Sequence, residues 1–112
     1  MRKIDKRLKP PAGLPRSARR WWLDVAGAYG MTGDEAGLRL LSEAAFALAR
    51  LEECRAIIAR DGAAVLDRFG AAKAHPLLQA EHHARSSFLA AVRALNLDVE
   101  PAKAIGRPGA AY

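Results

Sequence analysis

Residues 35–60 read EAGLRLLSEAAFALARLEECRAIIAR, an uninterrupted run without proline that is closed by Gly62. Apolar side chains recur at helical spacing along one side of it, at Leu41, Ala44, Leu48, Leu51 and Ile58. At 1.5 Å per residue the run predicts a helical rod of about 40 Å. A chain of 112 residues is too small to cover such a rod completely. A second layer must therefore come from another helix, from another subunit, or from both.

Two shorter helices are expected to flank this rod, one before it and one after it in the sequence. The first covers residues 18–29, with Ser17 as its N-cap and Gly30 as its C-terminal stop. The last covers about residues 76–95 and begins at Pro76, a residue type that suits the first helical turn. It carries an apolar stripe that consists of Leu77, Ala80, Ala84, Phe88, Ala91 and Leu95.

The connections between the helices carry capping and turn signals. Thr32 and Glu35 have the spacing of a capping box, which predicts Thr32 as the N-cap of the rod. The segment 63–75 is longer than a usual turn between helices, and this length indicates a small β-hairpin or a functional loop. The sequence therefore predicts an all-α fold. A short N-terminal helix precedes a long central helix and an antiparallel C-terminal helix, with a small hairpin or loop between the last two.

The positive charge of the chain is concentrated at its N-terminal end. Eight of the 18 Lys and Arg residues fall within residues 1–20, with Asp5 as the only acid, so this stretch carries +7. The other ten cations and eleven acids give −1, and the whole chain carries +6. Three prolines and a glycine between residues 10 and 15 disfavour helix there. We expect a flexible basic arm over 1–16, a helical DNA-binding and oligomerisation domain over 17–97, and a flexible tail over 98–112.

A cluster of cations with little apolar surface to bury is typical of a segment that binds a polyanion such as DNA. The sequence predicts DNA contacts from Arg2, Lys3, Lys6, Arg7, Lys9, Arg16, Arg19 and Arg20. Secondary contacts are expected at Arg39, Arg68 and Lys73. In this interpretation, deletion of residues 1–9 weakens DNA binding without unfolding the helices. The alternative is a solvated terminus that has no partner.

The residue types needed for catalysis or for a metal site do not occur at the required spacings. His82 and His83 are adjacent on a predicted helix and point about 100° apart, so they do not chelate one metal ion. Cys54 is the single cysteine, which excludes an internal disulfide and suits a reducing compartment. The sequence contains no apolar run of about 18 residues and no secretory signal. We expect a cytoplasmic protein that is not an enzyme, without cofactor, metal or membrane association.

Several short motifs follow one another in a particular order. They are Pro-Pro-Ala-Gly-Leu at 10–14, Trp22 in a helix that ends Tyr29-Gly30, Asp61-Gly62 followed by Gly70, Lys-Ala-His-Pro-Leu-Leu at 73–78, and Ala-Val-Arg-Ala-Leu-Asn-Leu at 91–97. In this order and spacing they resemble the phage terminase small subunit family, over about residues 10–101. The most specific part of the resemblance is His75-Pro76, which lies between a turn and a helix that ends Leu-x-Leu.

The resemblance implies the DNA-recognition component of a motor that packages double-stranded DNA. Members of such families assemble as rings, bind the viral genome near its packaging start, and deliver it to a large subunit that holds the ATPase and nuclease. The implied partners are double-stranded DNA and the terminase large subunit. The resemblance also implies a homo-oligomer larger than a dimer, located in the host cell cytoplasm. The family supplies no catalytic residue. We interpret His75 and Pro76 as structural residues that fix the junction between the hairpin and the last helix.

Two other classes of function remain open. Residues 30–39 join a short helix to a longer one through a tight turn, as in a helix-turn-helix regulator, which is usually a dimer. Asp34 and Glu35, however, place negative charge at the start of the second helix, where it repels phosphate. The third class is a helical adaptor whose basic end binds an acidic protein surface. The number of subunits and the salt dependence of DNA binding distinguish these classes.

Overall fold

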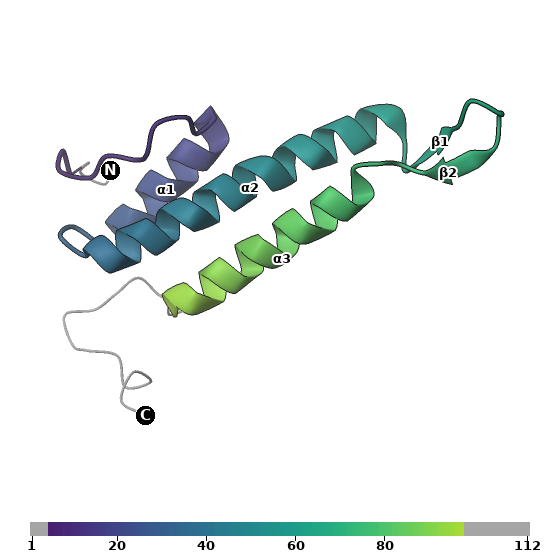
Figure 1. Cartoon of the computed structure of the whole chain (residues 1–112). Helices are drawn as coiled ribbons and strands as arrows, with labels where there is room; N and C mark the ends of the chain where they lie inside the picture. The colour runs from purple at the N-terminus through teal and green to yellow at the C-terminus, as the bar shows by residue number, and fades with distance from the viewer. Residues whose placement is uncertain (1–4, 98–112) are drawn as a thin grey trace.

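The computed structural model describes residues 5–97, which form three helices and one two-stranded hairpin (Figure 1). The elements in chain order are α1 (Arg16–Ala28), α2 (Glu35–Asp61), β1 (Ala64–Leu66), β2 (Ala72–Ala74) and α3 (Leu78–Leu95). Helix α3 returns alongside α2, and α1 also lies against α2. The predicted helical architecture is confirmed in outline, but the segment 63–75 contains an antiparallel hairpin, so the fold is not strictly all-α.

Helix α1 begins earlier than the sequence predicted. Its N-cap is Pro15, whose carbonyl oxygen accepts a helical hydrogen bond from the Arg19 N–H at 2.9 Å. The ring of Pro15 holds φ at −66°, and this residue has extended backbone immediately before the helix. The prediction of Ser17 as the N-cap is therefore wrong. Ser17 lies inside the first turn, where its Oγ donates to Glu52 Oε2 of α2 at 3.1 Å.

Helix α2 has a different N-cap from the one predicted. Asp34 caps it, because Asp34 Oδ1 accepts a hydrogen bond from the Gly37 N–H at 3.0 Å. Thr32 lies two residues too early for this role, and its hydroxyl donates to Asp5 Oδ2 at 2.6 Å. The apolar side of α2 agrees with the prediction. Buried residues recur along it at Leu41, Ala44, Ala45, Leu51 and Cys54.

The segment before α1 is packed onto the helices, unlike the flexible arm predicted over 1–16. Leu8 is only 7% exposed and belongs to the main core cluster. Asp5 ties the same segment to Thr32 in the loop before α2. Because deletion of residues 1–9 removes these contacts together with the charges, it is no longer expected to leave folding unaffected. Residues 1–4 and the predicted tail over 98–112 lie outside the described residues.

The core lies where α1, the first half of α2 and the C-terminal end of α3 meet. It is built from Leu8, Trp22, Ala26, Met31, Leu41, Ala45 and Leu95. The indole of Trp22 donates from Nε1 to Ser42 Oγ at 3.1 Å, so its polar atom is satisfied inside the core. The neighbouring Trp21 packs edge-on against Phe88 of α3, with ring centroids 5.4 Å apart. Both tryptophans of α1 therefore contribute to packing between the helices.

A buried histidine connects the hairpin to both long helices. His75 is 7% exposed, and its Nε2 lies 2.9 Å from Asp61 Oδ2 at the end of α2. Its Nδ1 accepts a hydrogen bond from the Leu77 N–H at 3.0 Å. Since Nδ1 is an acceptor, the proton of the neutral ring is on Nε2, which donates to the Asp61 carboxylate. This arrangement agrees with the structural role expected for His75.

The same contacts explain where α3 begins. The His75 imidazole accepts from the Leu77 N–H, and the His75 carbonyl accepts from the Leu78 N–H at 3.0 Å. These bonds close a turn over Pro76 and Leu77, and α3 begins after it at Leu78, two residues later than predicted. Asp61 also accepts hydrogen bonds from the Arg60 guanidinium at 2.8 and 3.1 Å. These bonds and the one from His75 hold the pKa of Asp61 well below its usual range. The carboxylate at this junction is therefore ionised at neutral pH.

Candidate nucleic-acid interface

The predicted DNA contacts that the structure describes lie at the surface, on two elements. Lys6, Arg7 and Lys9 belong to the segment before α1, and all three are exposed. Arg16, Arg19 and Arg20 belong to the first two turns of α1 and are exposed as well. Arg2 and Lys3 precede the described residues. We call the first set the segment cations and the second set the α1 arginines.

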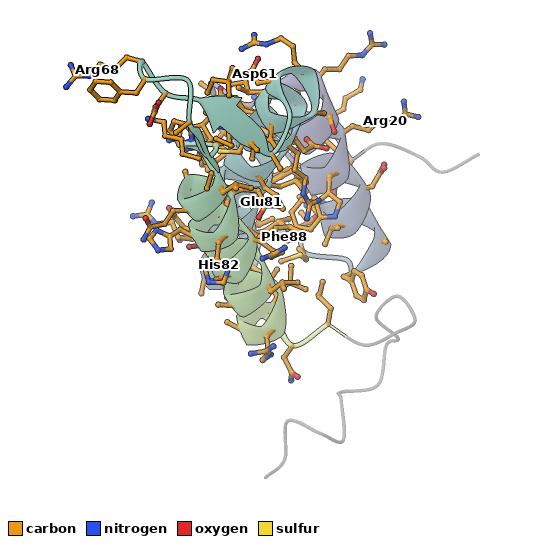
Figure 2. All side chains as sticks on the ribbon, turned by 90° about the vertical axis from the view of Figure 1, so that its right-hand side faces the viewer. Arg20, Asp61, Arg68, Glu81, His82 and Phe88 are labelled. Atoms are coloured by element: carbon orange, nitrogen blue, oxygen red, sulfur yellow. The ribbon has the colours of Figure 1, made fainter. Side chains whose placement is uncertain are left out.

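The α1 arginines share one side of the helix, because residues at i, i+3 and i+4 are neighbours on a helical surface. The first turn of α1 contains no acid. Positive charge at this end of a helix opposes the macrodipole, so Arg16 lowers the stability of the helix that carries it. No acid within residues 5–97 forms an ion pair with these arginines, and Figure 2 shows Arg20 projecting from the molecule. An anion placed here would interact favourably with both the guanidinium groups and the helix N-terminus.

The structure brings Arg39 together with two of the segment cations. Arg7, Lys9 and Arg39 line one shallow depression beside the start of α2, although 30 residues separate Lys9 from Arg39 in the chain. Glu35 also lines this depression and precedes Arg39 by four residues. A residue predicted as a secondary contact thus joins the primary set. Arg39 joins these cations because the N-terminal segment passes beside the start of α2. No sequence motif specified this path.

Asp5 positions this segment, a role that the sequence analysis did not assign. Its carboxylate accepts hydrogen bonds from the Thr32 hydroxyl at 2.6 Å and from the Arg7 backbone N–H at 2.9 Å. The Arg7 guanidinium is a further partner at 3.3 Å. The hydrogen bond from Thr32, followed by those from Arg7, lowers the pKa of Asp5 to about 2. Asp5 therefore neutralises Arg7 while leaving Lys6 and Lys9 without an ion pair inside residues 5–97.

The arginines of the long helices differ from the N-terminal cations because acids neutralise most of them. The ion pairs are Arg50–Glu53 at 3.3 Å, Arg55–Glu81 at 3.4 Å, Arg60–Asp61 at 2.8 Å and Arg85–Glu81 at 3.6 Å. The arginines of these pairs are exposed, and Glu81 is the partner with the least exposed side chain, at 17%. Each pair cancels the local field of its arginine. In the described part of the chain, the cations without an acidic partner are Lys6, Lys9, Arg16, Arg19, Arg20, Arg39, Arg68, Lys73 and Arg93. Six of these nine belong to the N-terminal segment, to α1 or to the depression beside them.

The two remaining predicted contacts lie on the hairpin. Lys73 is in β2, and Arg68 is in the turn, where its guanidinium stacks over the Phe69 ring at 5.0 Å from the centroid. Figure 2 shows Arg68 and Arg20 on opposite sides of the view. The hairpin cations are therefore not part of the surface formed by the segment cations and the α1 arginines.

Other types of site find little support in residues 5–97. No group of three or more His, Cys, Asp or Glu side chains there is arranged to hold a metal ion. His82 and His83 have ring centroids 6.0 Å apart and are tilted by 51°, and the Cys54 thiol is buried in α2. No helix in this part of the chain is long and apolar enough to cross a membrane.

Comparison with known proteins gives no match to a family model, to a curated protein or to a solved structure. The resemblance to phage terminase small subunits accordingly stays a prediction. The charge distribution and geometry of the described residues form the basis for assigning a function.

Proposed function

We propose that this protein is a non-catalytic component that binds double-stranded DNA and assembles on it, of the kind that phage terminase small subunits represent. The observation that carries the proposal is the set of α1 arginines. They are exposed, they share one side of the helix, and no acid among residues 5–97 pairs with them. Arg16 also lies in the first turn of the helix, where positive charge is least favourable for stability.

This placement is difficult to explain by folding alone. A cation in the first turn of a helix costs about 0.3–1 kcal/mol through the macrodipole, whereas an acid there is stabilising. Phosphate groups of a nucleic acid make the interaction at this helix end favourable, because they attract both the arginines and the positive end of the helix dipole. Lys6, Lys9 and Arg39 add cations beside the start of α2. Up to six unpaired cations per subunit are therefore able to contact phosphates.

A helix-turn-helix regulator is less well supported by the same geometry. A recognition helix presents its first turns to the major groove. Here the N-terminal segment lies beside the start of α2, where Arg7, Lys9 and Pro11 line a depression together with Glu35 and Ala36. Asp34 and Glu35 add negative charge at that position. These features favour sequence-independent contact with the phosphate backbone over base readout by α2.

The remaining elements of the proposal follow from the resemblance. The protein would act in the host cell cytoplasm, form an oligomer larger than a dimer, and deliver DNA to a large subunit that supplies ATPase and nuclease activity. It would have no catalytic activity, cofactor or metal of its own. The exposed surface of the long α2–α3 pair supports the oligomer, because a third helix covers this pair at one end only.

The direct test is a salt titration of DNA binding by fluorescence anisotropy, with a labelled duplex of about 30 base pairs. With up to six phosphate contacts per subunit, the slope of log K against log salt should reach at most about −5 per subunit. Single-stranded DNA and an acidic protein serve as competitors, and ATP hydrolysis is measured in parallel. Salt-independent binding, or stronger binding to the acidic protein than to the duplex, would overturn the proposal. Mass measurement by light scattering separates a larger assembly from a dimeric regulator.

A further inference from the structure

The hairpin carries an apolar surface at its turn that nothing in the described chain covers. Leu66 is 72% exposed and Phe69 is 80% exposed, and the Arg68 guanidinium stacks on the Phe69 ring. We call Leu66, Arg68 and Phe69 the hairpin tip. Figure 1 shows the hairpin projecting beyond the end of the paired helices, so the tip stands clear of the core. Phenylalanine and arginine are among the residue types enriched at protein interfaces relative to the rest of the surface.

The hairpin tip is held in one conformation by its own turn. Asp67 Oδ1 accepts hydrogen bonds from the Phe69 N–H at 2.8 Å and from the Ala71 N–H at 2.9 Å. The Asp67 N–H donates to the Ala71 carbonyl at 2.9 Å, and Gly70 provides the positive φ of +81° that the turn requires. The exposed side chains are therefore preorganised, which lowers the entropy that a binding partner must overcome.

A groove of matching character runs along the α2–α3 pair. Its volume is about 510 Å³, a size that accommodates an aromatic side chain and its neighbour. We call it the helix-pair groove, and its lining includes Glu43, Phe46, Ala47, Ala84, Ser87 and Ala91. Phe46 remains 42% exposed in it. Of the four large apolar side chains that are exposed in the described chain, two belong to the hairpin tip and one to this groove; the fourth, Leu89, lies elsewhere on α3.

The charges of the two surfaces are complementary. Arg68 at the tip has no acidic partner, and Glu43 in the groove has no cationic partner, within residues 5–97. The groove also contains His83 and Arg50, and Glu53 lies 3.3 Å from Arg50 and neutralises it. An arginine stacked on an aromatic ring therefore matches a groove that offers an aromatic ring, several small side chains and one unpaired carboxylate.

We propose that the hairpin tip of one copy of this chain docks into the helix-pair groove of a second copy. The two surfaces do not meet within one chain, because Phe46 precedes the end of α2 by fifteen residues, or about 22 Å of helix. When one tip binds one groove, the first copy still has an empty groove and the second copy still has an unbound tip. Such heterologous contacts repeat until they close into a ring or extend as a filament. The contact thus gives a physical basis for the proposed oligomer.

The experiment uses the full chain without DNA and measures mass by light scattering. Phe69→Ser removes the aromatic anchor of the tip, and Ser87→Lys places a long cation in the groove, where it also repels Arg68. Both positions are exposed, so folding should survive, which circular dichroism checks. Each variant should weaken self-association by about 30-fold or more. An equimolar mixture of the two variants should give a one-to-one pair and nothing larger, because it contains one intact tip and one intact groove.

Matched variants separate this contact from general effects. Leu89→Ser removes an equally apolar exposed side chain outside the contact, and Ser86→Lys adds the same charge outside the groove lining. Both should assemble as the parent does. Arg68→Glu and Glu43→Arg should each weaken assembly, and the double variant should recover it.

Four results would overturn the inference. They are a monomeric parent, full assembly of both contact variants, a mixture that stays monomeric, and a tip variant that loses DNA affinity while its mass is unchanged. The last result would assign the tip to DNA. Since the mass measurement contains no DNA, failure of this inference leaves the proposed DNA binding intact.

Discussion

Replacement of all three α1 arginines by Gln is expected to weaken DNA binding steeply while leaving the fold intact. Arg16, Arg19 and Arg20 are exposed and form no ion pair within residues 5–97, so no partner is left unsatisfied. Each phosphate contact contributes about 0.9 to the salt slope, so the slope should flatten by up to about 2.7 per subunit. A slope of about 2.7 means that the three contacts raise the affinity by about 500-fold when the salt concentration falls from 1 M to 0.1 M. The variant should therefore bind up to about 500-fold more weakly than the parent at 0.1 M salt.

A matched variant tests whether position or total charge is responsible. Replacement of Arg50, Arg55 and Arg85 by Gln removes the same three charges, so both variants change the net charge from +6 to +3. The exposed pair of Arg50 with Glu53 contributes about 0–1 kcal/mol. Glu81, whose side chain is 17% exposed, loses both Arg55 and Arg85, so circular dichroism must first confirm that this variant is folded. The matched variant should keep most of the affinity and of the salt slope of the parent. Fluorescence anisotropy with one labelled duplex at several salt concentrations measures all three proteins.

The comparison has two outcomes that refute the reasoning. If both variants lose affinity and slope equally, the net charge of the protein is responsible and the α1 surface has no special role. If the variant of Arg16, Arg19 and Arg20 binds as tightly as the parent across the titration, DNA binds elsewhere. The hairpin cations Arg68 and Lys73 would then be the next residues to replace.

Three further predictions concern the elements that position this surface. Leu8→Ala should reduce the free energy of unfolding by about 2–3 kcal/mol, because Leu8 is buried in the core; urea unfolding measures this, and an unchanged midpoint would contradict the packing of the segment. Thr32→Val should raise the pKa of Asp5 from about 2 towards 3.8, as followed by NMR titration. Because the pKa of Asp5 is lower in the folded protein than in the unfolded chain, ionised Asp5 stabilises the parent above about pH 4. This stabilisation is lost as the pH falls from about 4 to 2. The variant should lack most of this stabilisation. His75→Ala should cost about 1–3 kcal/mol in thermal unfolding, since a backbone N–H loses its acceptor. The control His82→Ala, at an exposed position outside the helix-pair groove, should stay within about 0.5 kcal/mol.

Local patterns in the sequence were sufficient for the helices and for the chemical character of the surface. The apolar spacing between Leu41 and Ile58 predicted the long helix, and the structure buries the first and keeps the second half-buried. Helix ends were harder to predict. Ser17 and Thr32 have the residue types of N-caps, but Pro15 and Asp34 hold those positions. Both observed caps are local, since Pro15 directly precedes α1 and Asp34 binds the Gly37 N–H three residues on. The long-range partners are those of the rejected candidates, because Ser17 binds Glu52 and Thr32 binds Asp5.

The sequence by itself determined that the chain is mostly helical, that its positive charge lies near the N-terminus, and that residues 63–75 interrupt the helices. These properties depend on residue types and on spacings within a few turns. Only the tertiary structure decided that Leu8 and Asp5 hold the basic segment against α2, that Arg39 joins Arg7 and Lys9, and that Arg55 of α2 pairs with Glu81 of α3. These facts depend on contacts such as Asp5 with Thr32 and Arg55 with Glu81, which are 27 and 26 residues apart. A local pattern carries no information about such pairs, because their partners meet only when the helices pack.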